Sequence, residues 1–524
     1  MTSDLTLNDS ASHAVAWNRV FAIASMVLVV LGIKLIFIQA FGSAVPYWDQ
    51  WDAEADHLYK DYLNSNLSWA TLISPHNEHR ILATRILSLA LFELDGGWDP
   101  ILQMVANAAL HVGVIVLLVT TFQRVLQWAN FLPFILFSIL VFALPLGWVN
   151  LLFGFQSPFY FLLMFSLLAL RGLVTSTALS LRWWLSLLCS VAAYFSLASG
   201  ALTAAAALAV LILQMLLGIR KGTKEYIAAG LLLTISVVMI SHIPHIEGHD
   251  SYRAQSMGQF LKALLQCLSY PRSVSFSGLW VSLPLVVYAC LVTVSRPVWQ
   301  SPHWLILSVI VWIFAQALSL SYGRSAVVME PRYLDLFIVA LPLDFGVLLI
   351  GANSLEFDGK RPIVVLATIV WLLTVLPALI KDTVVDAFPA IVQKGKDGKD
   401  QRDNVVAYLK TRNVAVLEGK ATFAIPYPNP ARLASLLSDS AIRLLLPEAI
   451  RPSEVREPEL LDHTWLHGEF RSATQWLKAF LLKAGPSMVG FGLAFALAAA
   501  FSGRRTWDDS LARPIREGTV CWSE

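Results

Sequence analysis

Five carboxylates stand among tryptophans and tyrosines in the segment PYWDQWDAEADHLYKDYLNSN, residues 46–66: Asp49, Asp52, Glu54, Asp56 and Asp61. On a helical wheel of about 100° per residue, three of them share a sector of roughly 60°, with an apolar face beside it formed by Trp48, Trp51, Ala55, Leu58 and Tyr62. This pattern predicts an amphipathic helix at a membrane interface. A carboxylate in a partly desolvated cavity there could act as a general base, because burial raises its pKa. The alternative is a solvated acidic face, although only Lys60 balances these acids.

A second polar cluster follows in SPHNEHRI, residues 74–81, which contains His76, Asn77, Glu78, His79 and Arg80. Three interpretations remain open. The cluster could contact a sugar or phosphate, it could begin a helix capped by Asn77, or it could bind a metal. The metal interpretation is the least favoured, because the spacing is not that of HExxH.

Two further polar segments lie between apolar runs. SYGRSAVVMEPRYLDL, residues 321–336, carries Arg324, Arg332 and Tyr333, and arginine is suited to phosphate because its planar fork donates paired hydrogen bonds. Its arginines could instead snorkel or pair with Glu330. HIPHIEGHD, residues 242–250, could hold a metal, but its loose spacing favours an ordinary loop.

The composition indicates the kind of fold that holds these polar segments. Hydrophobic residues make up 56% of the 524, charged residues make up 14%, and the mean hydropathy is +0.63, which indicates an all-α polytopic membrane protein. The net charge of +2 does not bear on nucleic-acid binding, but no basic stripe or nucleic-acid motif is found, so nucleic acid is not expected as a partner. The four cysteines have neither metal-type nor disulfide-framework spacing.

Apolar runs long enough to cross a bilayer predict about twelve transmembrane helices. They lie near 19–41, 99–122, 130–147, 157–172, 183–199, 201–218, 226–243, 278–295, 303–320, 333–351, 362–380 and 485–502. With the N-terminus inside, every short inner loop carries Lys or Arg. This scheme requires that Arg80–Leu94 lie on the outer face or re-enter it without crossing.

The predicted organisation has three parts. Residues 1–380 form a multi-span module whose first outside loop, 42–98, has juxtamembrane helices. Residues 381–484 form an outside segment in which IVQKGKDGKDQRDN is expected to be a flexible linker and the rest a small helical cap. Residues 485–524 form the last span and an inner tail.

This layout resembles the GT-C superfamily of membrane glycosyltransferases, which use polyprenyl-phosphate sugars. An acid near the start of a loop after the first span, followed by many spans and an outside C-terminal part, carries the resemblance. It implies that Asp49, or next Asp52, is the general base. Candidate substrate or donor contacts are Glu54, Asp56, His76, Asn77, Glu78, His79, Arg80, Arg324, Arg332 and Tyr333.

The resemblance also sets the expected setting and partners. The protein would lie in the bacterial inner membrane with its site facing the periplasm, and it would move sugar from a lipid-phosphate donor to a cell-envelope glycan or lipid such as lipopolysaccharide. No cofactor is certain, and a divalent metal stays possible. A divalent metal is not favoured, because the paired acidic motifs of metal-dependent oligosaccharyl transferases are not evident.

Three other functions stay open. A glycan polymerase or ligase would use a lipid-diphosphate donor and depend on arginines of a large outside loop. A flippase or transporter would need ionisable groups at mid-membrane, such as Lys34, His111 or Asp344. A membrane scaffold would need none of the clustered acids. The polar residues gather outside rather than at mid-membrane, which favours an enzyme.

Overall fold

The computed structural model describes residues 2–272, 276–353, 359–421, 423–452 and 457–511. Within this part, nine helices are long and apolar enough to cross a membrane: Trp17–Phe41, Pro100–Phe122, Gly154–Thr175, Ala198–Leu216, Thr223–Ser241, Pro302–Gly323, Pro331–Asn353, Arg361–Thr411 and Arg471–Ser502. The expectation of an all-α, multi-pass membrane protein is therefore confirmed. The predicted spans 130–147, 183–199 and 278–295 coincide with shorter helices, so twelve spans and the GT-C layout stay predictions. The inner tail lies mostly outside the described residues.

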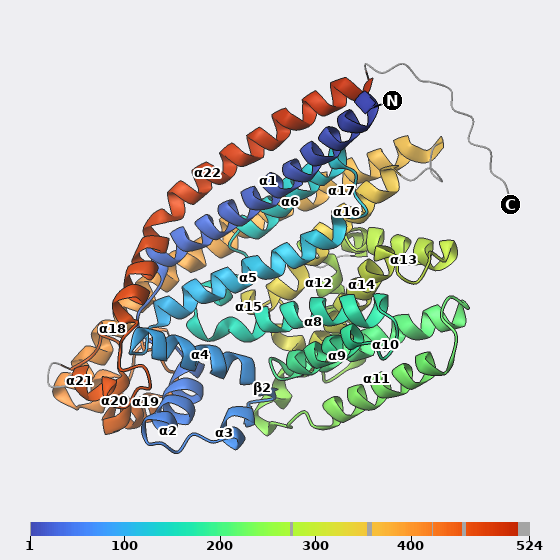
Figure 1. Cartoon of the computed structure of the whole chain (residues 1–524). Coiled ribbons are helices and arrows are strands. Elements are labelled where there is room, and N and C mark those ends of the chain that lie inside the picture. Colours follow the sequence, from blue (N-terminus) through green and yellow to red (C-terminus); the bar gives the residue numbers. More distant parts are fainter. Residues whose placement is uncertain (1, 273–275, 354–358, 422, 453–456, 512–524) are drawn as a thin grey trace.

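The bundle is built from helices that run back and forth along a common direction (Figure 1). Its members are α1 (Thr2–Phe41), α5 (Pro100–Phe122), α6 (Trp128–Ala143), α8 (Ser157–Thr175), α9 (Leu181–Tyr194), α10 (Ala201–Leu216), α11 (Thr223–Ser241), α12 (Met257–Ser269), α13 (Leu283–Ser295), α14 (Pro302–Gly323), α15 (Pro331–Ile338), α16 (Ala340–Asn353), α17 (Arg361–Lys381) and α22 (Arg471–Leu511). Several begin with proline in the first turn, where its missing N–H costs nothing. Large apolar side chains such as Phe134, Trp312 and Trp371 fill the interior.

The first and last long helices pack closely against each other through glycine (Figure 1). A Cβ added to Gly32 of α1 would lie 2.7 Å from the carbonyl oxygen of Gly485 in α22. One added to Gly492 would lie 2.7 Å from Cγ2 of Val29. Such close backbone approach is how small residues stabilise helix pairs where no hydrophobic driving force acts between helices.

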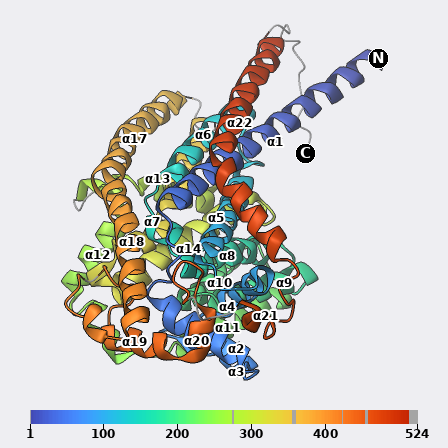
Figure 2. The same ribbon diagram turned by 90° about the vertical axis from the view of Figure 1, so that its left-hand side faces the viewer.

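The predicted flexible linker is wrong, because the segment is helical. Helix α17 continues through a π-helical turn, η8 (Asp382–Ala387), into α18 (Phe388–Thr411), which leads down to the C-terminal cap (Figure 2). Gly395 and Gly398 face the end of α1, where added Cβ atoms would lie 3.2 Å from Phe41 and 3.0 Å from Ser43. These glycines allow close packing rather than flexibility, and Ile391 and Val405 are fully buried on the helix.

The expected helical cap is present beyond α18. It consists of α19 (Pro430–Ser438), α20 (Ser440–Leu445) and α21 (Glu457–Leu461), beside the short helices of the first loop. These are η1 (Gln50–Tyr59), α2 (Lys60–Leu63) and α3 (Trp69–Ile73). Trp51 and Leu58 pack with Leu433, Leu437 and Ile442 of the cap in one buried cluster. The expectation that the aromatic face of 48–63 rests among lipid headgroups is therefore wrong for Trp51, because the protein itself covers it.

The segment 80–94, which the predicted topology requires not to cross the membrane, forms α4 (Leu82–Asp95). Its 14 residues extend about 21 Å at 1.5 Å per residue, which is short of the roughly 30 Å hydrocarbon core. Arg85 within this helix is buried, and it donates hydrogen bonds to the carbonyls of Thr71, Leu72 and Ser74. It thus satisfies the C-terminal carbonyls of α3 and ties the two helices together.

Candidate functional site

Asp49 stands at the start of η1, next to a strained residue. Trp48 has φ +48°, a left-handed conformation that is rare for a bulky side chain and costs on the order of 1–3 kcal/mol. Its N–H donates to the carbonyl of Pro426 at 2.8 Å, and its ring stacks on Phe423, so the cap holds the strained turn in place. The turn directs Asp49 away from the other acids, toward His76, whose Nε2 lies 3.6 Å from Oδ1 of Asp49.

Asp52 and Asp56 face the cap instead. Arg432 of α19 donates to Oδ1 of Asp52 at 2.8 Å and to Oδ2 of Asp56 at 2.6 Å. The Tyr427 hydroxyl donates to the second oxygen of Asp52 at 2.6 Å, and burial together with this bond raises the pKa of Tyr427 to about 12. Both oxygens of Asp52 are thus occupied, so the geometry favours Asp49 over Asp52 as the base. The wheel put the three acids together because it assumed α-helical spacing, whereas η1 is a π-helix with i→i+5 hydrogen bonds.

Glu54, a predicted substrate contact, is enclosed by the protein itself. It is 1% exposed, and its carboxylate accepts hydrogen bonds from Gln50, Ser88, Trp98 and Gln103. Burial raises the pKa of Glu54 against the opposite effect of these four donors. The residue holds η1 to α4 and α5 and has no surface from which to reach a ligand.

The second polar cluster is a β-hairpin rather than a capped helix start. Strands β1 (Pro75–His76) and β2 (His79–Arg80) pair antiparallel, with His76 opposite His79. Asn77 adopts φ +51° in the two-residue turn, a conformation that asparagine tolerates better than most residues. Asn77 is exposed, and Arg80 donates to the carbonyl of Ile73, so Arg80 fastens the hairpin to α3.

Glu78, at the tip of this hairpin, joins the first loop to the far side of the bundle. Nη2 of Arg324, just after α14, lies 2.9 and 2.8 Å from its two oxygens, and Nδ1 of His249 lies 2.6 Å from Oε1. Burial alone would raise the pKa of Glu78, but the His249 hydrogen bond and the Arg324 charge hold it at about 2. Glu78 is therefore an anion at neutral pH that orients Arg324.

His79 lies behind this ion pair. Its Nδ1 accepts a hydrogen bond from the backbone N–H of Ala198 at 3.3 Å, in the short turn that precedes α10. Burial lowers the pKa of His79 to about 4, against the raising effect of Glu78. His79 is thus neutral at pH 7 and carries its proton on Nε2.

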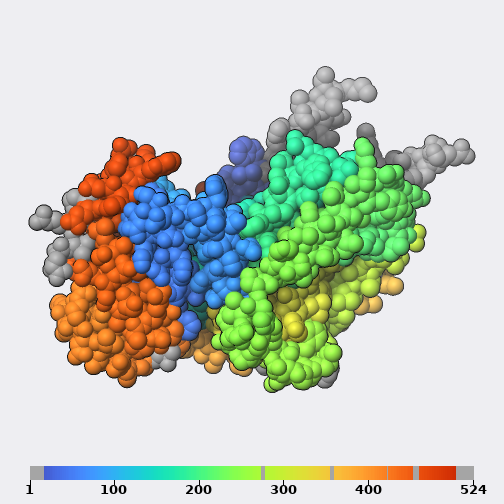
Figure 3. Space-filling view, turned by 90° about the horizontal axis from the view of Figure 1, so that it is seen from below, coloured from blue at the N-terminus to red at the C-terminus, as the bar shows by residue number. Residues whose placement is uncertain are grey.

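A cavity of about 410 Å³ opens beside these groups. Its walls are largely apolar and come from α8, the start of α10, the ends of α11 and α14, and α15; they include Phe159, Leu197, Leu202, Ile240, Leu320 and Leu336. Polar side chains line it as well: Glu78, His79, Arg253, Arg324, Tyr322 and Tyr333. Figure 3 shows the neighbouring surface, where the first loop (blue) lies between the C-terminal segment (orange to red) and the green segment that includes α11. An apolar chamber lined by two arginines suits a lipid that carries a phosphate.

Arg332 and Tyr333 begin α15 near both parts of the site. Arg332 pairs with Glu330 at 2.6 Å, as the alternative sequence interpretation expected, and its guanidinium lies 5.1 Å from the centre of the Tyr333 ring. The Asp49 charge acts on both Arg332 and His79. The structure therefore brings Asp49, His76, His79, Glu78, Arg324, Arg332 and Tyr333 to one region, and places Asp52, Asp56, Glu54 and Arg80 in supporting roles.

Metal-type clusters are not found among the described residues, where no group of three or more His, Cys, Asp or Glu could hold a metal ion. In the 242–250 segment, His245 pairs with Asp250 while His249 turns to Glu78. Cys189, Cys267 and Cys290 are free thiols, and Cys521 lies outside the described residues.

Sequence reasoning missed the cap residues Tyr427 and Arg432 and the role of His249 and Arg253. Only their charge or polarity could have signalled them, because their partners are far away in the chain. Comparisons with protein-family models, with curated proteins and with solved structures find no match. The case for function therefore rests on the geometry of the site.

Proposed function

We propose that this protein is a membrane glycosyltransferase that moves a sugar from a polyprenyl-phosphate carrier to a cell-envelope glycan or lipid. Its site would face the periplasm across the bacterial inner membrane. The observation that carries the proposal is the position of Asp49, a half-exposed acid within 3.6 Å of His76, in the region that also holds an apolar cavity lined by Arg253 and Arg324. The carrier chain would occupy the cavity, and its phosphate would bind the arginines.

The chemistry then follows from the positions of the charges. Asp49 takes the proton of the acceptor hydroxyl as that oxygen forms a bond to the anomeric carbon. The bond from this carbon to the phosphate oxygen breaks, and its electron pair leaves with the phosphate. Arg324 and Arg332 stabilise the negative charge that develops there. Glu78 keeps Arg324 oriented, and the neutral His79 provides an N–H donor for the sugar or phosphate.

The test compares Asp49→Asn with wild type and with Asp61→Asn in lipid nanodiscs. Asp61 lies on the same segment and is only partly buried, so Asp61→Asn is a matched control. Radiolabelled polyprenyl-phosphate sugars and an envelope-glycan extract are supplied, and label in the product is measured. We expect Asp49→Asn to slow transfer by about 10²–10⁴-fold, the range for loss of a general base, while Asp61→Asn stays near wild type. Full transfer by a folded Asp49→Asn would exclude Asp49 as the base.

A lipid flippase is the second candidate, because one polar cluster does lie inside the bundle. Lys34 of α1, His111 of α5 and Asp335 of α15 line a small cavity, and Asn150 and Tyr160 donate hydrogen bonds to Asp335. Ionisable groups within spans often mark a transport path. Movement of a fluorescent carrier across vesicles, lost in Asp335→Asn but kept in Asp49→Asn, would favour the flippase.

A further inference from the structure

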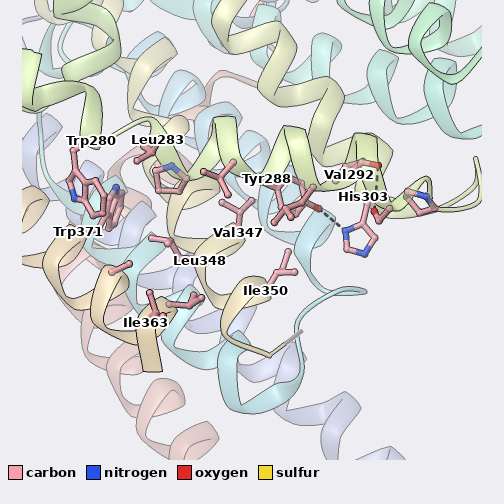
Figure 4. A pocket seen from close by; sticks show the side chains of 18 residues that line it. Trp280, Leu283, Tyr288, Val292, His303, Val347, Leu348, Ile350, Ile363 and Trp371 are labelled. Atoms are coloured by element: carbon pink, nitrogen blue, oxygen red, sulfur yellow. Dashed lines mark hydrogen bonds between the residues drawn. The ribbon is translucent and has the colours of Figure 1, made fainter. Parts of the chain in front are cut away.

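A second cavity, of about 400 Å³, lies in another part of the bundle, between α13, α14, α16 and α17. Its lining extends from Trp280 and Trp371 at one end to His303 at the other, with Val347, Leu348 and Ile363 between them (Figure 4). No residue lines both this cavity and the one beside Glu78. The enzyme proposal makes no use of it.

This cavity opens sideways toward the hydrocarbon of the bilayer. Lining residues of α13 and α17 are apolar and exposed in the protein alone: Leu283 is 41% exposed, Val287 48% and Ile363 67%. In a membrane such side chains face lipid, so an occupant enters from the bilayer rather than from water. The occupant therefore has a hydrocarbon chain.

One end of the cavity is polar and has cations beside it. The Tyr288 hydroxyl lies 2.7 Å from Nδ1 of His303 (Figure 4). Ser295, the last residue of α13, also lines the cavity. Arg296 ends α13 with φ +47°, between the lining residues Ser295 and Pro297. Exposed Lys360 and Arg361 begin α17, one turn or less before Ile363. Three cations thus stand at helix ends, within a few residues of the cavity lining.

We infer that this cavity is a binding site for an anionic phospholipid of the surrounding leaflet. One acyl chain lies along the apolar wall from His303 toward Trp371, and the phosphate contacts Arg296 and Arg361. Basic pockets between helices at a membrane surface recognise such headgroups through charge. The lateral opening supplies the chain, and the cations supply the preference for a negative head.

Native mass spectrometry of the purified full chain tests this. The protein is titrated with phosphatidylglycerol or with phosphatidylcholine of identical acyl chains. We expect phosphatidylglycerol to bind at least about tenfold more tightly, because each nearby cation adds about 1 kcal/mol. The double variant Arg296→Gln with Arg361→Gln should lose this preference, and the control Lys221→Gln with Lys224→Gln, two exposed lysines at the start of α11, should keep it. Equal binding of the two lipids, or equal loss in the control, would overturn the inference.

A second pair of variants tests the cavity itself without touching its charges. Ala367→Trp fills the cavity from α17, whereas Val365→Trp adds the same bulk to a residue that is exposed and does not line it. We expect Ala367→Trp to release the bound phosphatidylglycerol and Val365→Trp to retain it, with both proteins monodisperse. Retention in a monodisperse Ala367→Trp would show that the cavity is not the site.

Discussion

The acids on the two sides of the first loop have different partners. On the side under the C-terminal cap, Asp52 and Asp56 are bound by Arg432, and Glu54 is enclosed by four donors. On the side facing the bundle, Asp49 has one histidine 3.6 Å away and a side chain that is 36% exposed, near a cavity lined by arginine. Acids of one short segment thus divide into structural groups and one group that is available for chemistry.

This difference shows that partners, and not the local density of acids, decide what a carboxylate does. A carboxylate whose oxygens are saturated by donors stabilises the fold and has no lone pair left for a substrate proton. One that is left partly exposed beside neutral or cationic groups can take a proton. The following experiments test this division.

The largest effect is expected for Glu54→Ala. Removing the carboxylate leaves four donors without a buried acceptor, so we expect the free energy of unfolding to fall by about 3–5 kcal/mol. Thermal unfolding in detergent measures the loss, with Asp61→Ala as the control that should change little. A stable Glu54→Ala protein with defective transfer would place Glu54 in the chemistry and break the comparison.

Arg324→Gln should come next. It removes a charged donor from both Glu78 and the cavity, so we expect KM for the lipid-phosphate sugar to rise about 10- to 100-fold. Arg324→Lys should recover only part of this, because an ammonium cannot reproduce the planar fork. Radiolabel transfer at varied donor concentration separates KM from kcat. An unchanged KM in Arg324→Gln would show that the donor phosphate does not bind at Arg324.

The hairpin should give a smaller, pH-dependent effect. The pKa of His79 is about 4 in the fold against 6.5 for the free side chain, so the unfolded chain binds more protons between these values and stability falls as pH drops from about 6.5 to 4. The pKa of Glu78 is about 2 against 4.5, so its contribution is lost at lower pH, between about 4.5 and 2. Thermal scans should show that stability depends less on pH between about 4 and 6.5 in His79→Gln than in wild type. The exposed control His463→Gln should keep the wild-type dependence. An identical slope in His79→Gln would contradict the burial of His79.

The smallest effect is expected for Arg432→Gln. Its ion pairs with Asp52 and Asp56 are partly exposed, so they contribute only about 1 kcal/mol. We expect a slight loss of stability with faster hydrogen exchange in η1 and α19, and a transfer rate within a few-fold of wild type. Abolished transfer in a folded Arg432→Gln would mean that the cap side takes part in the reaction, with Asp52 as the alternative base.

The helix bundle could be predicted from the sequence. The contacts around the candidate site could be predicted only in part. Apolar runs identified the bundle because span length is fixed by the bilayer. The polar stretches of the first loop and of α14–α15 were expected on one side, and the structure places them in contact through Glu78 and Arg324. The roles implied for them in sugar transfer remain predictions.

The division among the acids could not be predicted, because it depends on distant partners. Tyr427 and Arg432 are 375 and 380 residues from Asp52 in the chain, and nothing in their own surroundings points to it. The π-helix also defeats a wheel drawn at α-helical spacing. The linker error has a different cause: the polar composition of IVQKGKDGKDQRDN favours a flexible linker, whereas Gly395 and Gly398 in it pack against the end of α1.

The close contact between α1 and α22 at Gly32, Gly485 and Gly492 has a consequence for biosynthesis. The first helix leaves the ribosome early, but the helix that covers Gly32 and Val29 is made only after the whole of the intervening chain. Until then that face of α1 is exposed to lipid or to an insertion factor, and the bundle stays open along one edge. Synthesis of α22 is therefore the step that covers this face of α1, and a product that stops before Arg471 would present the uncovered face to membrane quality control.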